Sequence, residues 1–166
     1  MRIADQLGTE DLRQIHLAIF QDSAVQYLRS GPFGHAEHRR TEQRIRNVAG
    51  TKLRRVIGAV PEFSERGLPA AWSHFMAVAA GTHVWPDANH RTAIVAFDQA
   101  TRSGLGLTIA LAEDDAVNLV VASKAMRDRD FRDRSRYYTI EELADPDHPY
   151  RRLLATFEDW LIVEAL

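Results

Sequence analysis

The stretch from His83 to Thr92, which reads HVWPDANHRT, combines side chains that could carry out phosphate chemistry. His83 is a candidate general base, because an imidazole with a pKa of about 6.5 accepts a proton near neutral pH. Asp87 is a candidate ligand for a hard cation, and Arg91 could pair with a phosphate. Together they fit phosphoryl or nucleotidyl transfer, which needs a base, a metal on the phosphate oxygens and cations on the developing charge.

A plainer interpretation of the same residues stays open. Asp87 and Asn89 could cap the following helix through an Asx turn, and His83 could be an ordinary loop histidine. The stretch runs directly into a predicted helix N-terminus, whose backbone N–H groups and partial positive charge favour anions. Residue types alone do not decide between the two interpretations.

Apolar residues at three- and four-residue spacing predict two helices around this stretch. The first, over residues 68–80, is Ala-rich and carries Trp72 and Phe75 on one face. The second, over residues 89–103, is closed by Gly104 at its C′ position. The stretch is therefore expected to be a polar loop held between two apolar helices.

Most of the remaining chain shows the same helical periodicity. Further helices are expected from Thr9 onward, over residues 37–60 and over residues 116–126. A capping box predicts a short helix over residues 139–142. A last helix is expected from Pro149 onward, with Trp160 and Leu161 facing inward. Residues 30–34 and 61–69 are expected to be loops, and residues 105–111 an extended piece. The predicted fold class is mainly α, with at most a short β-hairpin.

Composition and charge restrict the class of protein. The chain has 166 residues and no Cys, with 45% hydrophobic and 27% charged residues, as expected for one soluble domain. Thiolate zinc sites and Cys nucleophiles are excluded. The net charge of −2 weighs against a general nucleic-acid binder. With no apolar run of about 18–20 residues and no signal-peptide pattern, a cytoplasmic protein without a membrane partner is expected.

The stretch resembles the signature of the Fic/Doc family, and most closely its Doc (death on curing) branch, which reads H-x-F-x-D-A-N-K-R-T-A. His83, Asp87 and the run from Ala88 to Ala93 match at fixed spacing, with Trp85 in the aromatic position and His90 in place of Lys. The resemblance extends over about residues 9–126. It implies a single Fic-type helical domain over residues 1–166, with a C-terminal helical extension over about residues 139–166.

The resemblance implies ATP- and Mg²⁺-dependent transfer of a phosphoryl group to a hydroxyl of a target protein, by a toxin restrained by a separate antitoxin. In the implied site His83 is the general base, Asp87 holds Mg²⁺, and the nucleotide phosphates bind to Ala88, Asn89, His90 and Arg91. Two alternatives stay open. The first is an enzyme that transfers AMP or another nucleotidyl group, and the second is a non-catalytic member that only binds a nucleotide or a partner.

Departures from the Fic pattern favour the Doc branch. His90 stands where that pattern has its second Gly, and Ile94 stands where it has its distal Arg. Because only a cation would replace the Doc lysine, a role for His90 in phosphate binding requires its imidazolium form. The autoinhibitory [S/T]-x-x-x-E-[G/N] motif of some Fic proteins is absent, since no Ser or Thr has a Glu four positions later.

Two other patterns are weaker. His35 and His38 have the His-x-x-His spacing of a metal site without its companion ligands, and the resemblance places them in the flap that holds a target peptide. The run from Arg127 to Arg136 alternates in charge and is expected to be a solvated loop. Contact with nucleic acid is its minor alternative.

Overall fold

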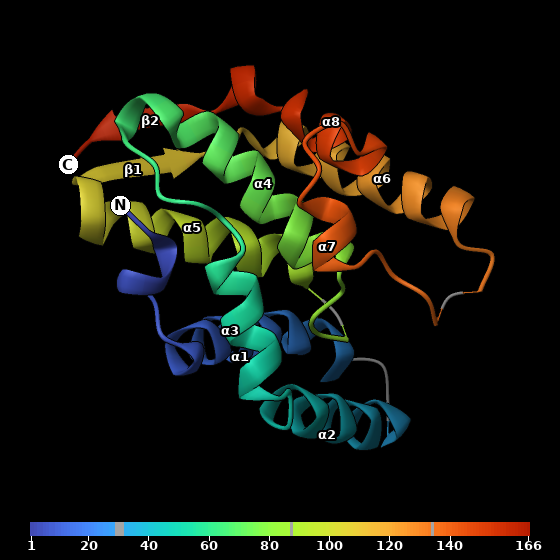
Figure 1. The fold of residues 1–166 in the computed structure, drawn as a ribbon. Coiled ribbons are helices and arrows are strands. Elements are labelled where there is room, and N and C mark those ends of the chain that lie inside the picture. Colours follow the sequence, from blue (N-terminus) through green and yellow to red (C-terminus); the bar gives the residue numbers. More distant parts are fainter. Residues whose placement is uncertain (29–31, 87, 134) are drawn as a thin grey trace.

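The computed structural model describes residues 1–28, 32–86, 88–133 and 135–166, and leaves the side chains of residues 23–35 undescribed. The helices are α1 (Thr9–Leu28), α2 (Pro32–Arg46), α3 (Gly50–Gly58), α4 (Leu68–Gly81), α5 (Asn89–Leu105), α6 (Glu113–Asp130), α7 (Ile140–Leu143) and α8 (Pro149–Ala155) (Figure 1). Strands β1 (Leu107–Ala110) and β2 (Ile162–Ala165) form an antiparallel sheet. The mainly α fold class is confirmed.

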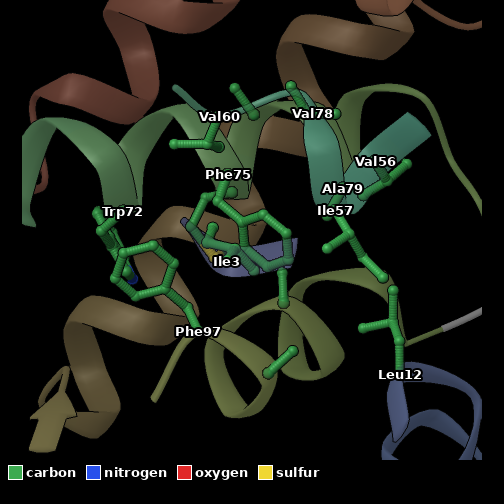
Figure 2. Close-up of a cluster of buried hydrophobic side chains, with 14 of the residues drawn as sticks. Ile3, Leu12, Val56, Ile57, Val60, Trp72, Phe75, Val78, Ala79 and Phe97 are labelled. Atoms are coloured by element: carbon green, nitrogen blue, oxygen red, sulfur yellow. The ribbon is translucent and has the colours of Figure 1, made fainter. Parts of the chain in front are cut away.

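Helix α4 forms the centre of the fold and packs against both α5 and α8. Its sequence is apolar on almost every side, so burial on all sides is the arrangement that removes most apolar surface from water. Phe75 lies beside Phe97 of α5 and near Ile3 in the cluster shown in Figure 2. The predicted helix over residues 68–80 and the burial of Trp72 are confirmed.

The segment expected as one helix over residues 37–60 is two helices, α2 and α3. The connection between them is held by Arg13 of α1, whose guanidinium donates to the backbone oxygen of Val48 at 2.9 Å. The break allows Ile45 of α2 and Leu53 of α3 each to be buried. The prediction of one continuous helix is wrong, because the apolar pattern alone does not reveal the change of direction between α2 and α3.

The flap expected around His35 and His38 is also wrong, because residues 33–38 belong to α2. The His38 ring stacks on Phe20 of α1, with ring centroids 4.7 Å apart. The side chain of His35, and with it the expected His-x-x-His pair, lies outside the described part of the chain. The segment around His38 is therefore part of a helix that packs against α1.

The expected C-terminal helix ends early. Helix α8 stops at Ala155, a 3₁₀ turn follows, and β2 then pairs with β1 in the register Leu107 with Ala165 and Ala110 with Ile162. Trp160 is 57% exposed and not inward, because the chain has already left the helix there. The extension over residues 139–166 is thus helical only in part, and the sheet joins strands distant in sequence.

Two expected helix ends also differ. Helix α5 continues through Gly104, where a Cβ would lie 2.1 Å from Met1 Sδ. It ends at Leu105 and is capped by Gly106, whose φ of 67° is left-handed. Helix α6 continues to Asp130, so the charged run expected as a loop is helical in its first residues. The capping box at Thr139 is confirmed.

No helix in the described ranges is long and apolar enough to cross a membrane.

Candidate functional site

The connection from α4 to α5 is a tight loop anchored by Trp85. Trp85 is 1% exposed, and its ring stacks on His16 of α1 with centroids 4.3 Å apart, so it anchors the loop in the core. The backbone N–H of Trp85 donates to Asn89 Oδ1 at 2.9 Å, and Asn89 Nδ2 donates to the Trp85 oxygen at 2.9 Å. Asn89 therefore shapes the loop with its side chain. It does not cap α5 as the plainer interpretation expected, because Ala88 occupies the N-cap position of that helix.

Two residues of this loop have left-handed backbone conformations. His83 has φ 49°, and Ala88, which precedes the first residue of α5, has φ 57° and ψ 23°. A side chain in this region costs about 1–2 kcal/mol, because Cβ approaches the following carbonyl oxygen. Such strain is concentrated at functional sites, where the surrounding structure holds it in place.

Three adjoining pockets meet at His83, and each is named here after a helix that borders it. The α5 pocket, of about 100 Å³, is lined by His83, Ala88, Asn89, His90, Arg91, Val120, Lys124 and Arg127. The α6 pocket, of about 320 Å³, is lined by His83, Pro86, Lys124, Arg127, Asp128, Phe131, Arg136 and Tyr137. The α3 pocket, of about 350 Å³, is lined by Arg44, Val48, Lys52, His83, Val84, Trp85, Pro86 and Tyr137.

Tyr137 fixes the orientation of the His83 ring. The two rings are stacked with centroids 4.4 Å apart and planes within 2°. The guanidinium of Arg127 lies over the Tyr137 ring, 5.2 Å from its centroid. Because Tyr137 belongs to the connection between α6 and α7, the C-terminal part of the chain helps to build the site.

Cations dominate the α5 and α6 pockets. Among the described lining residues, Asp128 is the one carboxylate, whereas four side chains are cationic: Arg91, Lys124, Arg127 and Arg136. The N-terminus of α5, with its partial positive charge, opens into the same space. This arrangement favours an anion with several charges, such as a polyphosphate.

His90 is turned into the core and not toward solvent. Its side chain is 7% exposed, and Nε2 lies 2.8 Å from the Ser123 hydroxyl, which in turn bonds to the Tyr150 hydroxyl. Burial, together with the nearby Arg127 and Lys124, lowers the pKa of His90 to about 4. The ring is therefore neutral at pH 7, and the imidazolium form that a role in phosphate binding requires is not present there. If His90 contacts a phosphate, it does so through its backbone N–H and not through its ring.

Asp87 lies outside the described residues, so its role as a Mg²⁺ ligand stays a prediction. Within the described part, no three His, Asp or Glu side chains come close enough to hold a metal by themselves. A Mg²⁺ ion held by one carboxylate and substrate phosphates needs no such group.

The sequence did not single out Lys124, Arg127, Arg136 or Tyr137 as site residues. One compositional signal pointed to the region: the chain has only two lysines, Lys52 and Lys124, and both line pockets beside His83. Placing these residues required the packing of α6 against the rest of the fold. Their sequence distance from the motif hides this proximity.

Comparisons with known proteins return no match to a family model, to a curated protein or to a solved structure. Membership of the Fic/Doc family therefore stays a prediction from the motif.

Proposed function

We propose that the protein transfers the γ-phosphoryl group of ATP to a hydroxyl of another protein. The observation that carries the proposal is the position of His83, which lines two cationic pockets and the separate α3 pocket. A general base for this reaction has to lie between the site of the donor phosphate and the site of the acceptor hydroxyl. His83 occupies such a junction.

The α5 and α6 pockets are the proposed donor site. The first turn of α5 provides backbone N–H groups without acceptors inside the helix, and Lys124 and Arg127 supply positive charge beside them. The larger α6 pocket adds Phe131, whose ring suits contact with a nucleobase. The two pockets share Lys124 and Arg127, so one extended nucleotide could occupy both.

In the proposed reaction His83 accepts the proton of the acceptor hydroxyl. The acceptor oxygen then forms a bond to the γ-phosphorus, the bond from that phosphorus to the β,γ-bridging oxygen breaks, and ADP leaves. Lys124 and Arg127 stabilise the negative charge that develops on the leaving phosphate. Mg²⁺, with Asp87 as its proposed ligand, would neutralise charge on the phosphate oxygens. His83 finally releases its proton to solvent.

The resemblance to the Doc branch adds a biological setting to this proposal. Such an enzyme would be the toxin of a pair, acting on a target protein in the cytoplasm and restrained by a separate antitoxin. Transfer of AMP to the same hydroxyl would use the same base and the same donor site. The two reactions differ in which phosphorus atom is attacked.

The position of the label in ATP distinguishes these reactions. The purified protein is incubated with a cell lysate and with ATP labelled at either the γ or the α phosphorus. Labelling of a protein from the γ position supports the proposal, whereas labelling from the α position supports nucleotidyl transfer. Labelling from neither position would leave the non-catalytic alternative.

Variants link the label to the site. Replacing a general base typically lowers the rate by about 10²–10⁴-fold, so His83→Ala should lose the transfer. His148→Ala, at the N-cap of α8 and outside the three pockets, is the matched control and should keep it. Undiminished transfer by His83→Ala would refute the proposed role.

A further inference from the structure

The α3 pocket carries a positive charge that the donor site does not use. Arg44 of α2 and Lys52 of α3 line it, and its described lining residues include no Asp or Glu. Val48 and Pro86 give the same pocket an apolar wall. The pocket therefore combines two cations with an apolar surface, next to His83.

Neither cation is neutralised by the described part of the chain. Arg46, on the same helix as Arg44, pairs with Glu42 at 2.6 Å, whereas no ion pair is formed by Arg44 or Lys52 among the described residues. Partial desolvation lowers the pKa of Lys52, with no carboxylate of the described residues beside it to oppose the shift, although the side chain is exposed. An anionic group entering the pocket would supply the missing countercharge.

The α3 pocket is separate from the cations of the proposed donor site. It shares His83, Pro86 and Tyr137 with the α6 pocket, but not Lys124 or Arg127. A molecule in the α3 pocket could thus reach His83 while a polyphosphate occupies the other side. This is the relation that a phosphoryl acceptor must have to its donor.

We propose that the α3 pocket binds the acceptor protein through an acidic segment that flanks the modified hydroxyl. Carboxylates of this segment pair with Arg44 and Lys52, and an apolar side chain packs against Val48 and Pro86. This inference rests on the proposed function, which it deepens by naming the substrate class.

A protein segment fits the pocket better than a nucleic acid does. Binding along a phosphate backbone uses a stripe of many cations and a basic surface, because it depends on the release of many counterions. Here two cations, Arg44 and Lys52, are among the described residues that line a volume of about 350 Å³, and the chain has a net charge of −2. Isolated carboxylates next to an apolar side chain match this arrangement.

Binding is tested with fluorescent peptides that differ only in charge. Each peptide has one threonine and one leucine, flanked by glutamates in the first, glutamines in the second and lysines in the third. Fluorescence anisotropy measures their affinity for the full chain, and the γ-labelled ATP assay measures transfer to the threonine. We expect the acidic peptide to bind about tenfold more tightly than the glutamine peptide. High salt should weaken the binding of the acidic peptide, because it screens the charges.

Charge reversal assigns the effect to the pocket. Arg44→Glu and Lys52→Glu should each weaken the acidic peptide by about threefold to tenfold, and the double variant should prefer the lysine peptide. Arg40→Glu is the matched control, because Arg40 is an exposed cation of α2 that lines none of the three pockets. The affinity for ATP should be unchanged within about twofold in all these variants.

The outcomes separate this inference from the proposed function. Equal binding of the acidic and glutamine peptides, or equal losses in Arg40→Glu and Arg44→Glu, would overturn the acidic-segment site even if transfer from ATP is observed. Tighter competition by a single-stranded RNA would overturn it in favour of a nucleic acid. If the acidic peptide binds as expected but receives no label in any form, the binding site is supported and the proposed transfer fails.

Discussion

Acidification should destabilise the protein through the buried ring of His90. Burial lowers its pKa in the folded protein to about 4, against 6.5 for an ordinary histidine. Between these values the unfolded chain binds a proton that the folded chain does not, so the free energy of unfolding falls as the pH falls. The contribution of the neutral ring is complete above about pH 6.5 and is lost progressively down to about pH 4.

The magnitude at pH 5 follows from the same two pKa values. The gap of about 1.5 pH units between pH 5 and the pKa of the unfolded chain corresponds to about 2 kcal/mol, at roughly 1.4 kcal/mol per unit. Urea unfolding at pH 7 and pH 5 measures this loss. In His90→Gln the drop between the two pH values should be about 2 kcal/mol smaller than in the unsubstituted protein, since glutamine does not titrate.

His74 of α4 offers an independent comparison. It is 8% exposed, and burial followed by the charge of Arg151 lowers its pKa to about 4. His74→Gln should therefore remove a similar part of the pH dependence, and the effects of the two substitutions should add.

If His90→Gln and the unsubstituted protein lose equal stability on acidification, the assignment of a neutral, buried His90 is wrong.

A neutral His90 also bears on phosphate binding. The lysine that the Doc branch has at this position would bring a positive charge to the α5 pocket, and the His90 ring does not at pH 7. Lys124 and Arg127 of α6 line the same pocket and carry positive charge there. In the proposed site these two residues replace the charge that the motif itself lacks.

Three further substitutions test the local structure, each by chemical denaturation. Ala88→Gly should raise the free energy of unfolding by about 1 kcal/mol, because glycine adopts the left-handed φ of 57° without strain; no gain would show that the loop conformation is different. Gly81→Ala should lower it by about 1–3 kcal/mol, since the new Cβ would lie 2.9 Å from Cε1 of the buried Tyr150; a neutral effect would contradict the packing of α4 against α8. Thr139→Ala should lower it by about 1 kcal/mol by removing the capping bond from the Glu142 N–H, and an unchanged value would show that α7 does not depend on this cap.

Sequence patterns predicted the elements next to the motif well. Helix α4 is apolar on nearly every side, and α5 begins at Asn89, where the motif ends its polar loop. The capping box at Thr139 and the proline at the start of α8 marked two further helix starts. These features are local, so a single sequence contains the information that determines them.

Features that depend on distant contacts were missed. Strand β2 is short and fully exposed, and it forms because β1 lies beside it, although the two are separated by most of the C-terminal part of the chain. The break between α2 and α3 depends on Arg13 of α1. The burial of His90 depends on Ser123 of α6, and the stack on His83 depends on Tyr137. No local pattern in the sequence contains these partners.

The central claim is that His83 transfers a phosphoryl group from ATP to a protein hydroxyl. Its most direct test is mass spectrometry of proteins from cells that express either the unsubstituted chain or His83→Ala, with circular dichroism confirming that both are folded. We predict a phosphoryl adduct on a serine or threonine of a target protein, present with the unsubstituted chain and absent with His83→Ala. The same adduct at the same level with His83→Ala, or no adduct with either chain, would contradict the claim.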